Sequence, residues 1–144
     1  MMRAYFLLCI TGLLTGCQIG THPLATNTPA PELSPAALNA IAGDMVMRLA
    51  EQVGSRSGAV VLTQGSLSFD LALAGALKSS GFEVATDGKA DGRKDAILLS
   101  CAIDDYEGRT LVQLSTENFA VARAYSTTAG GATPASPISV IRRG

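Results

Sequence analysis

Residues 58–86, GAVVLTQGSLSFDLALAGALKSSGFEVAT, decide the fold that the sequence predicts. GAVVLTQ is a short apolar run without alternation, which is typical of a strand buried on both faces. The next segment predicts a helix that begins at Ser66 or Ser68 and ends at Gly81. FEVAT predicts a second strand. A strand, a helix and a strand in this order form a βαβ unit, whose strands are expected to be parallel. The helix residues expected in the core are Phe69, Leu73 and Leu77.

An amphipathic helix is predicted in front of this unit, over SPAALNAIAGDMVMRLAEQVG. Ser34 suits the N-cap and Pro35 the first helical position, and Gly54 suits the end. On the polar side, Asp44 and Arg48 are four residues apart and can pair. Apolar residues at spacings of three and four mark the buried face: Leu38, Ile41, Met45, Leu49 and Val53.

Alternating apolar and polar residues predict antiparallel strands after the unit. AILLSCAIDDY and TLVQLSTE each place every second side chain inward, and FAVARAYSTT follows after a turn. In FAVARAYSTT the buried face stays open: Arg123 favours partial solvent contact for its own face, while the alanines of the other face allow another layer to approach closely. The inward residues expected on the first two strands are Ile97, Leu99, Cys101, Ile103, Val112 and Leu114.

The predicted fold class is α/β (α+β), a small single domain over residues 34–144. It consists of the N-terminal helix, the β-α-β unit and antiparallel strands that form one mixed sheet. Pro134 and Pro137 keep the C-terminal segment extended. There, ISVI is expected either to add an edge strand or to dock on another subunit, and the alternative of a packed or frayed terminus stays open.

Residues 1–16 predict a lipoprotein signal peptide. Arg3 precedes an uncharged, mostly apolar stretch over residues 4–14, which is too short to span a membrane, for which about 20 residues are needed. It ends in Leu14-Thr15-Gly16-Cys17, which resembles the bacterial lipobox. There a diacylglycerol is linked to the cysteine thiol before the peptidase cuts in front of that residue. We therefore expect Cys17 to be the lipidation site and the first residue of the mature chain.

Residues 17–33 are expected to be the acylated N-terminus followed by a flexible tether, since they are rich in Pro, Thr and Ala. Gln18 favours the outer membrane, because Asp at this position retains lipoproteins in the inner membrane of enteric-type bacteria. His22 lies alone in the tether, so no catalytic or metal-binding role is expected for it.

No catalytic residue, metal site or cofactor is predicted. Cys101 is expected to be a small buried hydrophobe. The acidic group Asp104, Asp105 and Glu107 is interpreted as a solvated hairpin tip. The loop over residues 87–95 does not match a calcium-binding EF-hand loop that would start at Asp87. Lys89 and Leu98 would occupy its third and twelfth positions, which need oxygen ligands. With 11 basic and 12 acidic residues, the chain gives no basis for direct nucleic-acid binding.

Several stretches resemble the TrbH family of conjugal transfer lipoproteins: LSPAALNAIAGDMVMRLAEQVG, DDYEG followed by VQLST, ARAY, and GATPASPISVIRRG. The resemblance covers nearly the whole chain. It implies an outer-membrane lipoprotein of a plasmid mating pair formation (type IV secretion) apparatus, lipid-anchored at Cys17, with its domain in the periplasm. The implied role is structural support of the channel core complex, with other Trb subunits as partners. The alternative is an envelope accessory lipoprotein that regulates a cell-wall synthase or an export pore.

Overall fold

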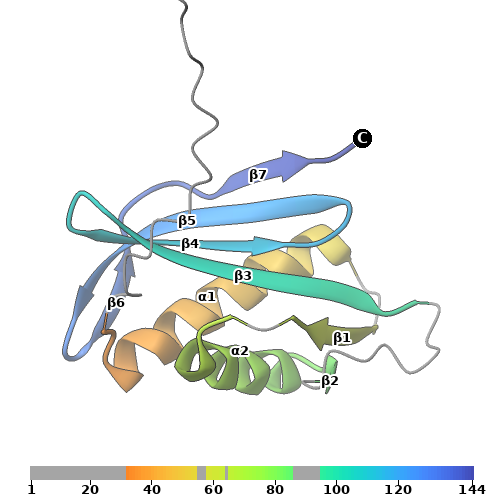
Figure 1. Cartoon of the computed structure of the whole chain (residues 1–144), viewed down its shortest axis with the longest axis horizontal. Coiled ribbons are helices and arrows are strands. Elements are labelled where there is room, and N and C mark those ends of the chain that lie inside the picture. Colours follow the sequence, from red (N-terminus) through yellow and green to blue (C-terminus); the bar gives the residue numbers. More distant parts are fainter. Residues whose placement is uncertain (1–31, 55–57, 64, 86–94) are drawn as a thin grey trace, which may run out of the picture.

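The computed structural model describes residues 32–54, 58–63, 65–85 and 95–144, in which two helices lie on one side of a mixed sheet (Figure 1). The helices are α1 (Pro35–Val53) and α2 (Leu67–Ser79). The strands are β1 (Ala59–Leu62), β2 (Glu83–Ala85), β3 (Ile97–Tyr106), β4 (Arg109–Ser115), β5 (Phe119–Thr128), β6 (Gly131–Pro134) and β7 (Ser139–Arg142). Their order across the sheet is β2-β1-β3-β4-β5-β6, and β7 also pairs with β5. This arrangement confirms the predicted fold class.

The βαβ unit forms as predicted. β1 pairs in parallel with β2 on one side and with β3 on the other. Helix α2 ends at Ser79, and the chain turns away at Gly81, which has a φ of +91° that glycine tolerates best. The next amide, of Phe82, donates to the Leu77 carbonyl at 3.0 Å. Fully buried on the sheet-facing side of α2 are the three expected residues, Phe69, Leu73 and Leu77.

Helix α1 begins and ends at the residues that the sequence indicates. The Ser34 hydroxyl oxygen accepts a hydrogen bond from the Ala37 amide at 3.1 Å, and Gly54 has a φ of +72°. Of the expected apolar face, Leu38 and Val53 are only half-buried. The helix is buried more widely than that stripe, and its buried residues are Ala37, Ile41, Ala42, Met45, Val46 and Leu49.

Strands β3, β4 and β5 form an antiparallel meander. β3 and β4 are joined at Glu107 and Gly108, with φ values of 52° and 72°, and positive φ at both positions is what a two-residue hairpin turn requires. The register places Cys101 opposite Leu114 and Leu114 opposite Val121, so these side chains share one face of the sheet. That face lies against the helices and carries the expected inward residues of β3 and β4.

The open question about the two faces of β5 is answered by its contacts. Val121 and Tyr125 belong to the core beneath the helices, so Arg123, which alternates with them, points to the helix side as well. The alanines of β5 lie on the opposite face, which no described helix covers (Figure 1). Arg123 is therefore mostly buried rather than wet, with 17% of its side chain exposed.

The C-terminal segment forms two strands, of which the sequence analysis expected one. β6 and β7 both pair antiparallel with the edge of β5 that β4 leaves free. The pairs Tyr125–Pro134 and Ala122–Ser139 are three residues apart along β5 but five residues apart along the C-terminal segment. The two extra residues form a bulge between β6 and β7. The edge strand that ISVI predicted is confirmed as β7.

Candidate functional site: the Asp44 cluster and the C-terminal strands

Asp44 on α1 is the centre of a polar cluster that joins this helix to β5. Its carboxylate accepts a hydrogen bond from the Tyr125 hydroxyl at 2.6 Å. The Arg123 guanidinium donates to both carboxylate oxygens, at 2.9 and 3.2 Å. Only 16% of the Asp44 side chain is exposed. Each charge in the cluster has a partner, and such pairing offsets the cost of removing the carboxylate and the guanidinium from water. We call Asp44, Arg123 and Tyr125 the Asp44 cluster.

The predicted pair of Asp44 and Arg48 is present, but it is the weaker contact of this carboxylate. The Arg48 Nε lies 3.7 Å from Asp44, whereas its terminal nitrogen lies 2.8 Å from Glu51. The sequence predicted Asp44 on the polar side of α1, but the structure does not place this residue on a solvent face. It faces β5, because α1 is buried over a wider arc than its apolar stripe indicates.

The Tyr125 phenol is held in its protonated form. Burial raises the pKa of Tyr125, and the hydrogen bond that its hydroxyl donates to Asp44 raises the pKa further. The phenol therefore acts as a fixed donor across the ordinary pH range. The Asp44 cluster has the properties of a structural tie between α1 and β5 rather than of an acid–base pair.

The same arginine also fixes the bulge of the C-terminal segment. The Arg123 Nε donates to the Ser136 carbonyl at 2.9 Å, and the Ala124 amide donates to the Ser136 hydroxyl oxygen at 2.9 Å. The hydroxyl thus takes the place of a backbone acceptor that the bulge removes from the ladder. Arg123 links three parts of the fold: helix α1, strand β5 and the segment that leads to β7.

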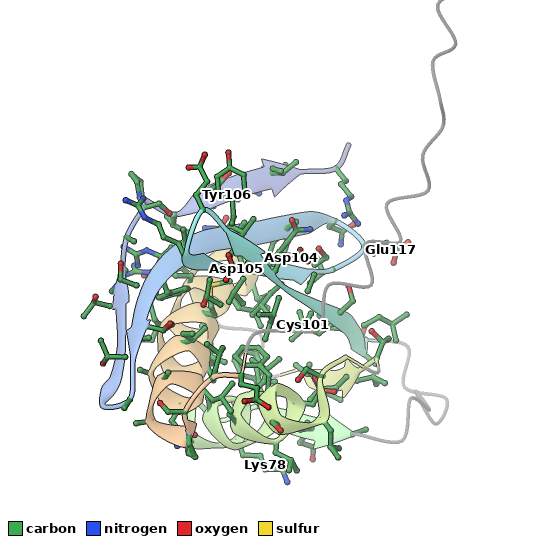
Figure 2. All side chains as sticks on the ribbon, turned by 60° about the vertical axis from the view of Figure 1, so that its left-hand side comes forward. Lys78, Cys101, Asp104, Asp105, Tyr106 and Glu117 are labelled. Atoms are coloured by element: carbon green, nitrogen blue, oxygen red, sulfur yellow. The ribbon has the colours of Figure 1, made fainter. Side chains whose placement is uncertain are left out.

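Cys101 faces the helix side of β3, where it packs against the core (Figure 2). Burial, followed by the nearby charge of Asp70, raises the pKa of Cys101 to about 12. A thiol with so high a pKa is a poor nucleophile at neutral pH. The interpretation of Cys101 as a packed side chain fits this environment, although the residue is half-buried rather than fully buried.

Alkylation by iodoacetamide tests this environment. At pH 8 the thiolate fraction at Cys101 should be roughly a thousandfold below that of an ordinary thiol of pKa about 8.5. Mass spectrometry of the Cys101 peptide should therefore show little label in the native protein and rapid labelling in guanidinium chloride. Equal rates in the native and unfolded states would contradict the buried placement.

The acidic group lies at the hairpin between β3 and β4, as predicted. Figure 2 shows Asp104, Asp105 and Tyr106 together at the end of β3, far from Lys78 on α2. Asp104, Asp105 and Glu107 are all exposed. Asp105 accepts a hydrogen bond from the Gly108 amide at 3.3 Å, which closes the turn. The acidic group is therefore part of a solvated turn, as the sequence indicated.

Other sequence predictions lie outside the described residues: Cys17, His22 and most of the loop tested for calcium, residues 87–94. Within the described residues, no group of three or more His, Cys, Asp or Glu side chains is arranged to hold a metal ion. No helix of the described part of the chain has the length and apolar character needed to cross a membrane.

The Asp44 cluster escaped the sequence analysis because it joins residues that are distant in the chain. Asp44 lies 79 residues from Arg123 and 81 from Tyr125. One signal was present: Arg123 alternates with Val121 and Tyr125, so a buried β5 face would bring its charge inside and require a carboxylate there. Nothing in the sequence indicated that Asp44 would be that carboxylate.

Comparison with known proteins gives two matches of wide coverage. A family model described as "Conjugal transfer protein TrbH" matches residues 20–144. The chain is also 45% identical, over 149 aligned residues, to a "Probable conjugal transfer protein TrbH" from Sinorhizobium fredii (strain NBRC 101917 / NGR234). That alignment covers 99% of each chain. No solved structure matches the chain.

Proposed function

The chain belongs to the TrbH family of conjugal transfer proteins, and from this premise we propose that it is an outer-membrane lipoprotein of a plasmid conjugal transfer apparatus. Its domain stands in the periplasm and supports the core complex of the secretion channel through contacts with other Trb subunits. The observation that carries the proposal is the family match over residues 20–144, which begins three residues after the cysteine of the lipobox-like LTGC. This membership also favours the transfer apparatus over a wall-synthase or export-pore regulator.

The anchor at Cys17 follows from the N-terminal sequence. A short apolar stretch after Arg3 and before Leu14-Thr15-Gly16-Cys17 matches what lipoprotein processing requires. Each methylene buried in the bilayer contributes about 0.8 kcal/mol, so a single acyl chain holds only marginally, whereas two or three hold stably. Gln18 in place of Asp supports the outer membrane.

A role in binding rather than catalysis fits the chemistry of the described domain. The mostly buried charges of the Asp44 cluster are paired with each other, and the Cys101 thiol has a raised pKa. Of the exposed acidic group at the β3–β4 hairpin, Asp105 closes the turn. What the domain offers to a partner is therefore its surface.

Metabolic labelling with an alkyne palmitate analogue tests the anchor. The wild-type protein should carry the label and fractionate with the outer membrane, and the Cys17→Ser variant should lose the label because the hydroxyl cannot form the thioether. Cys101→Ser is the matched control, since it removes a cysteine outside the lipobox and should keep the label. Label that persists in Cys17→Ser would refute the anchor, and label in the inner-membrane fraction would refute the proposed membrane.

A further inference from the structure

Strand β7 is an edge whose outer backbone groups face away from the sheet. The Arg143 amide donates to the Asn118 carbonyl at 2.7 Å, and the register places Ile141 opposite Ala120. Hydrogen-bonded and non-bonded pairs alternate along an antiparallel ladder. The backbone N–H and C=O groups of Ile141 are therefore hydrogen-bonded to β5, while those of Val140 and Arg142 point away from β5. Figure 1 shows β7 at the rim of the sheet, on the side of β5 away from β4.

Within the described residues, this edge has few of the features that usually protect sheet edges. Free edges are blunted by proline, by charged side chains along the strand or by a covering segment. Pro134 and Pro137 both lie before β7, and β6 packs against α1. Arg142 is the one charged residue of β7, and among the described residues β7 is the part of this edge that has neither a proline nor a covering helix. Val140 and Ile141 are 38% and 56% exposed, which is high for large apolar side chains in a strand.

The charge at the end of β7 is positive. Arg142 donates to the Gln52 side chain at 3.1 Å and Arg143 to the Thr116 carbonyl at 3.0 Å, so both guanidinium groups are held by neutral acceptors. Neither forms an ion pair with a carboxylate of the described residues. Glu117 lines the same hollow as Arg143, whereas Arg142 is not among the residues that line it, so Arg142 is the better point for an incoming carboxylate.

We propose that β7 is a docking edge for an extended segment of another transfer subunit that carries apolar residues and at least one carboxylate. The segment adds a strand beside β7, bonding to the outward groups of Val140 and Arg142, with its apolar side chains beside Val140 and Ile141 and its carboxylate at Arg142. The backbone bonds provide affinity, and the apolar and charged contacts provide selectivity. The inference rests on the proposed function, since it names the chemistry of the partner.

The outward direction of the Val140 amide allows a sharp test. Val140→Pro removes the N–H that an added strand would use, and it leaves the β5–β7 hydrogen bonds intact because this amide does not join them. Val140→Ala is the matched control, which shortens the side chain and keeps the N–H. Ile141→Pro removes an amide that bonds to β5, so it should destabilise the strand itself. Thermal unfolding of Val140→Pro and Val140→Ala should coincide closely.

The binding experiment uses the other subunits of the apparatus, each purified singly, against the full-length protein in detergent. We expect one of them to bind the wild type and Val140→Ala, and to bind Val140→Pro at least about tenfold more weakly, as the loss of backbone hydrogen bonds implies. Arg142→Glu should weaken the same complex, because it places a carboxylate against a carboxylate. In mating assays Val140→Pro should transfer less well than Val140→Ala.

Several results would overturn the inference. Equal binding by Val140→Pro and Val140→Ala would exclude strand addition at this edge, and so would the absence of any binding subunit. If Val140→Pro instead changes only self-association of the protein, the occupant is a second copy. Normal plasmid transfer by a deletion strain would refute the proposed function itself. If the deletion strain transfers poorly but the Val140→Pro strain transfers normally, this inference alone is refuted.

Discussion

Replacing Arg123 by alanine is expected to lower the free energy of unfolding by about 3 kcal/mol, because removing one partner of a buried ion pair leaves the other charge uncompensated. Asp44 would lose its closest cationic partner in a place where only 16% of its side chain is exposed. The variant would also release Ser136 and with it the bulge that leads to β7. Urea unfolding of the purified protein, followed by circular dichroism, measures the loss.

Arg48→Ala is the matched control, because it removes the other cation near the same carboxylate. Arg48 lies 3.7 Å from Asp44 and is 33% exposed, so its loss should cost less than about 1 kcal/mol. The double variant Asp44→Ala/Arg123→Ala should lose less than the sum of the single variants, since no lone charge remains. Equal costs for Arg48→Ala and Arg123→Ala would contradict the central place given to Arg123.

The elements that the sequence predicted well are those that local chemistry determines. Ser34 and Gly54 mark the two ends of α1 because a hydroxyl caps the free amides and glycine accepts a positive φ. The βαβ unit follows from an unalternating apolar strand next to a helix of regular apolar period. Such signals act over a few residues, so a single amino-acid sequence is enough to predict these elements.

The C-terminal segment was harder to predict because its structure depends on β5. Gly131–Pro134 has little strand propensity, and it becomes β6 because β5 offers an open edge beside α1. The bulge depends on the Ser136 hydroxyl and on Arg123 together. Prolines indicate extended backbone without saying which strand it pairs with.

The candidate site divides in the same way. The sequence indicated that Cys101 faces the core and that the carboxylates near Gly108 form a turn, since alternation and turn chemistry are local. It did not indicate the Asp44 cluster, whose members meet only when α1 packs on β5. Burial of one charge predicts an opposite charge nearby, but only the packed fold identifies which residue supplies it.

Loss of the protein is expected to reduce plasmid transfer sharply, because the proposed role is to support the channel itself. A deletion strain complemented with Cys17→Ser should remain defective. On the proposed anchoring, a domain that lacks the acyl chains would diffuse through the periplasm, and its effective concentration at the channel would fall by roughly a hundredfold or more. Mating frequency, measured with protein levels matched by immunoblot, reports the effect.

The most direct test of the central claim is the mating frequency of an in-frame deletion strain, with and without the wild-type gene supplied in trans. We expect transfer to be abolished or strongly reduced in the deletion strain, to be restored by the wild type and by Cys101→Ser, and not to be restored by Cys17→Ser. A deletion strain that transfers the plasmid at the wild-type frequency would contradict the central claim.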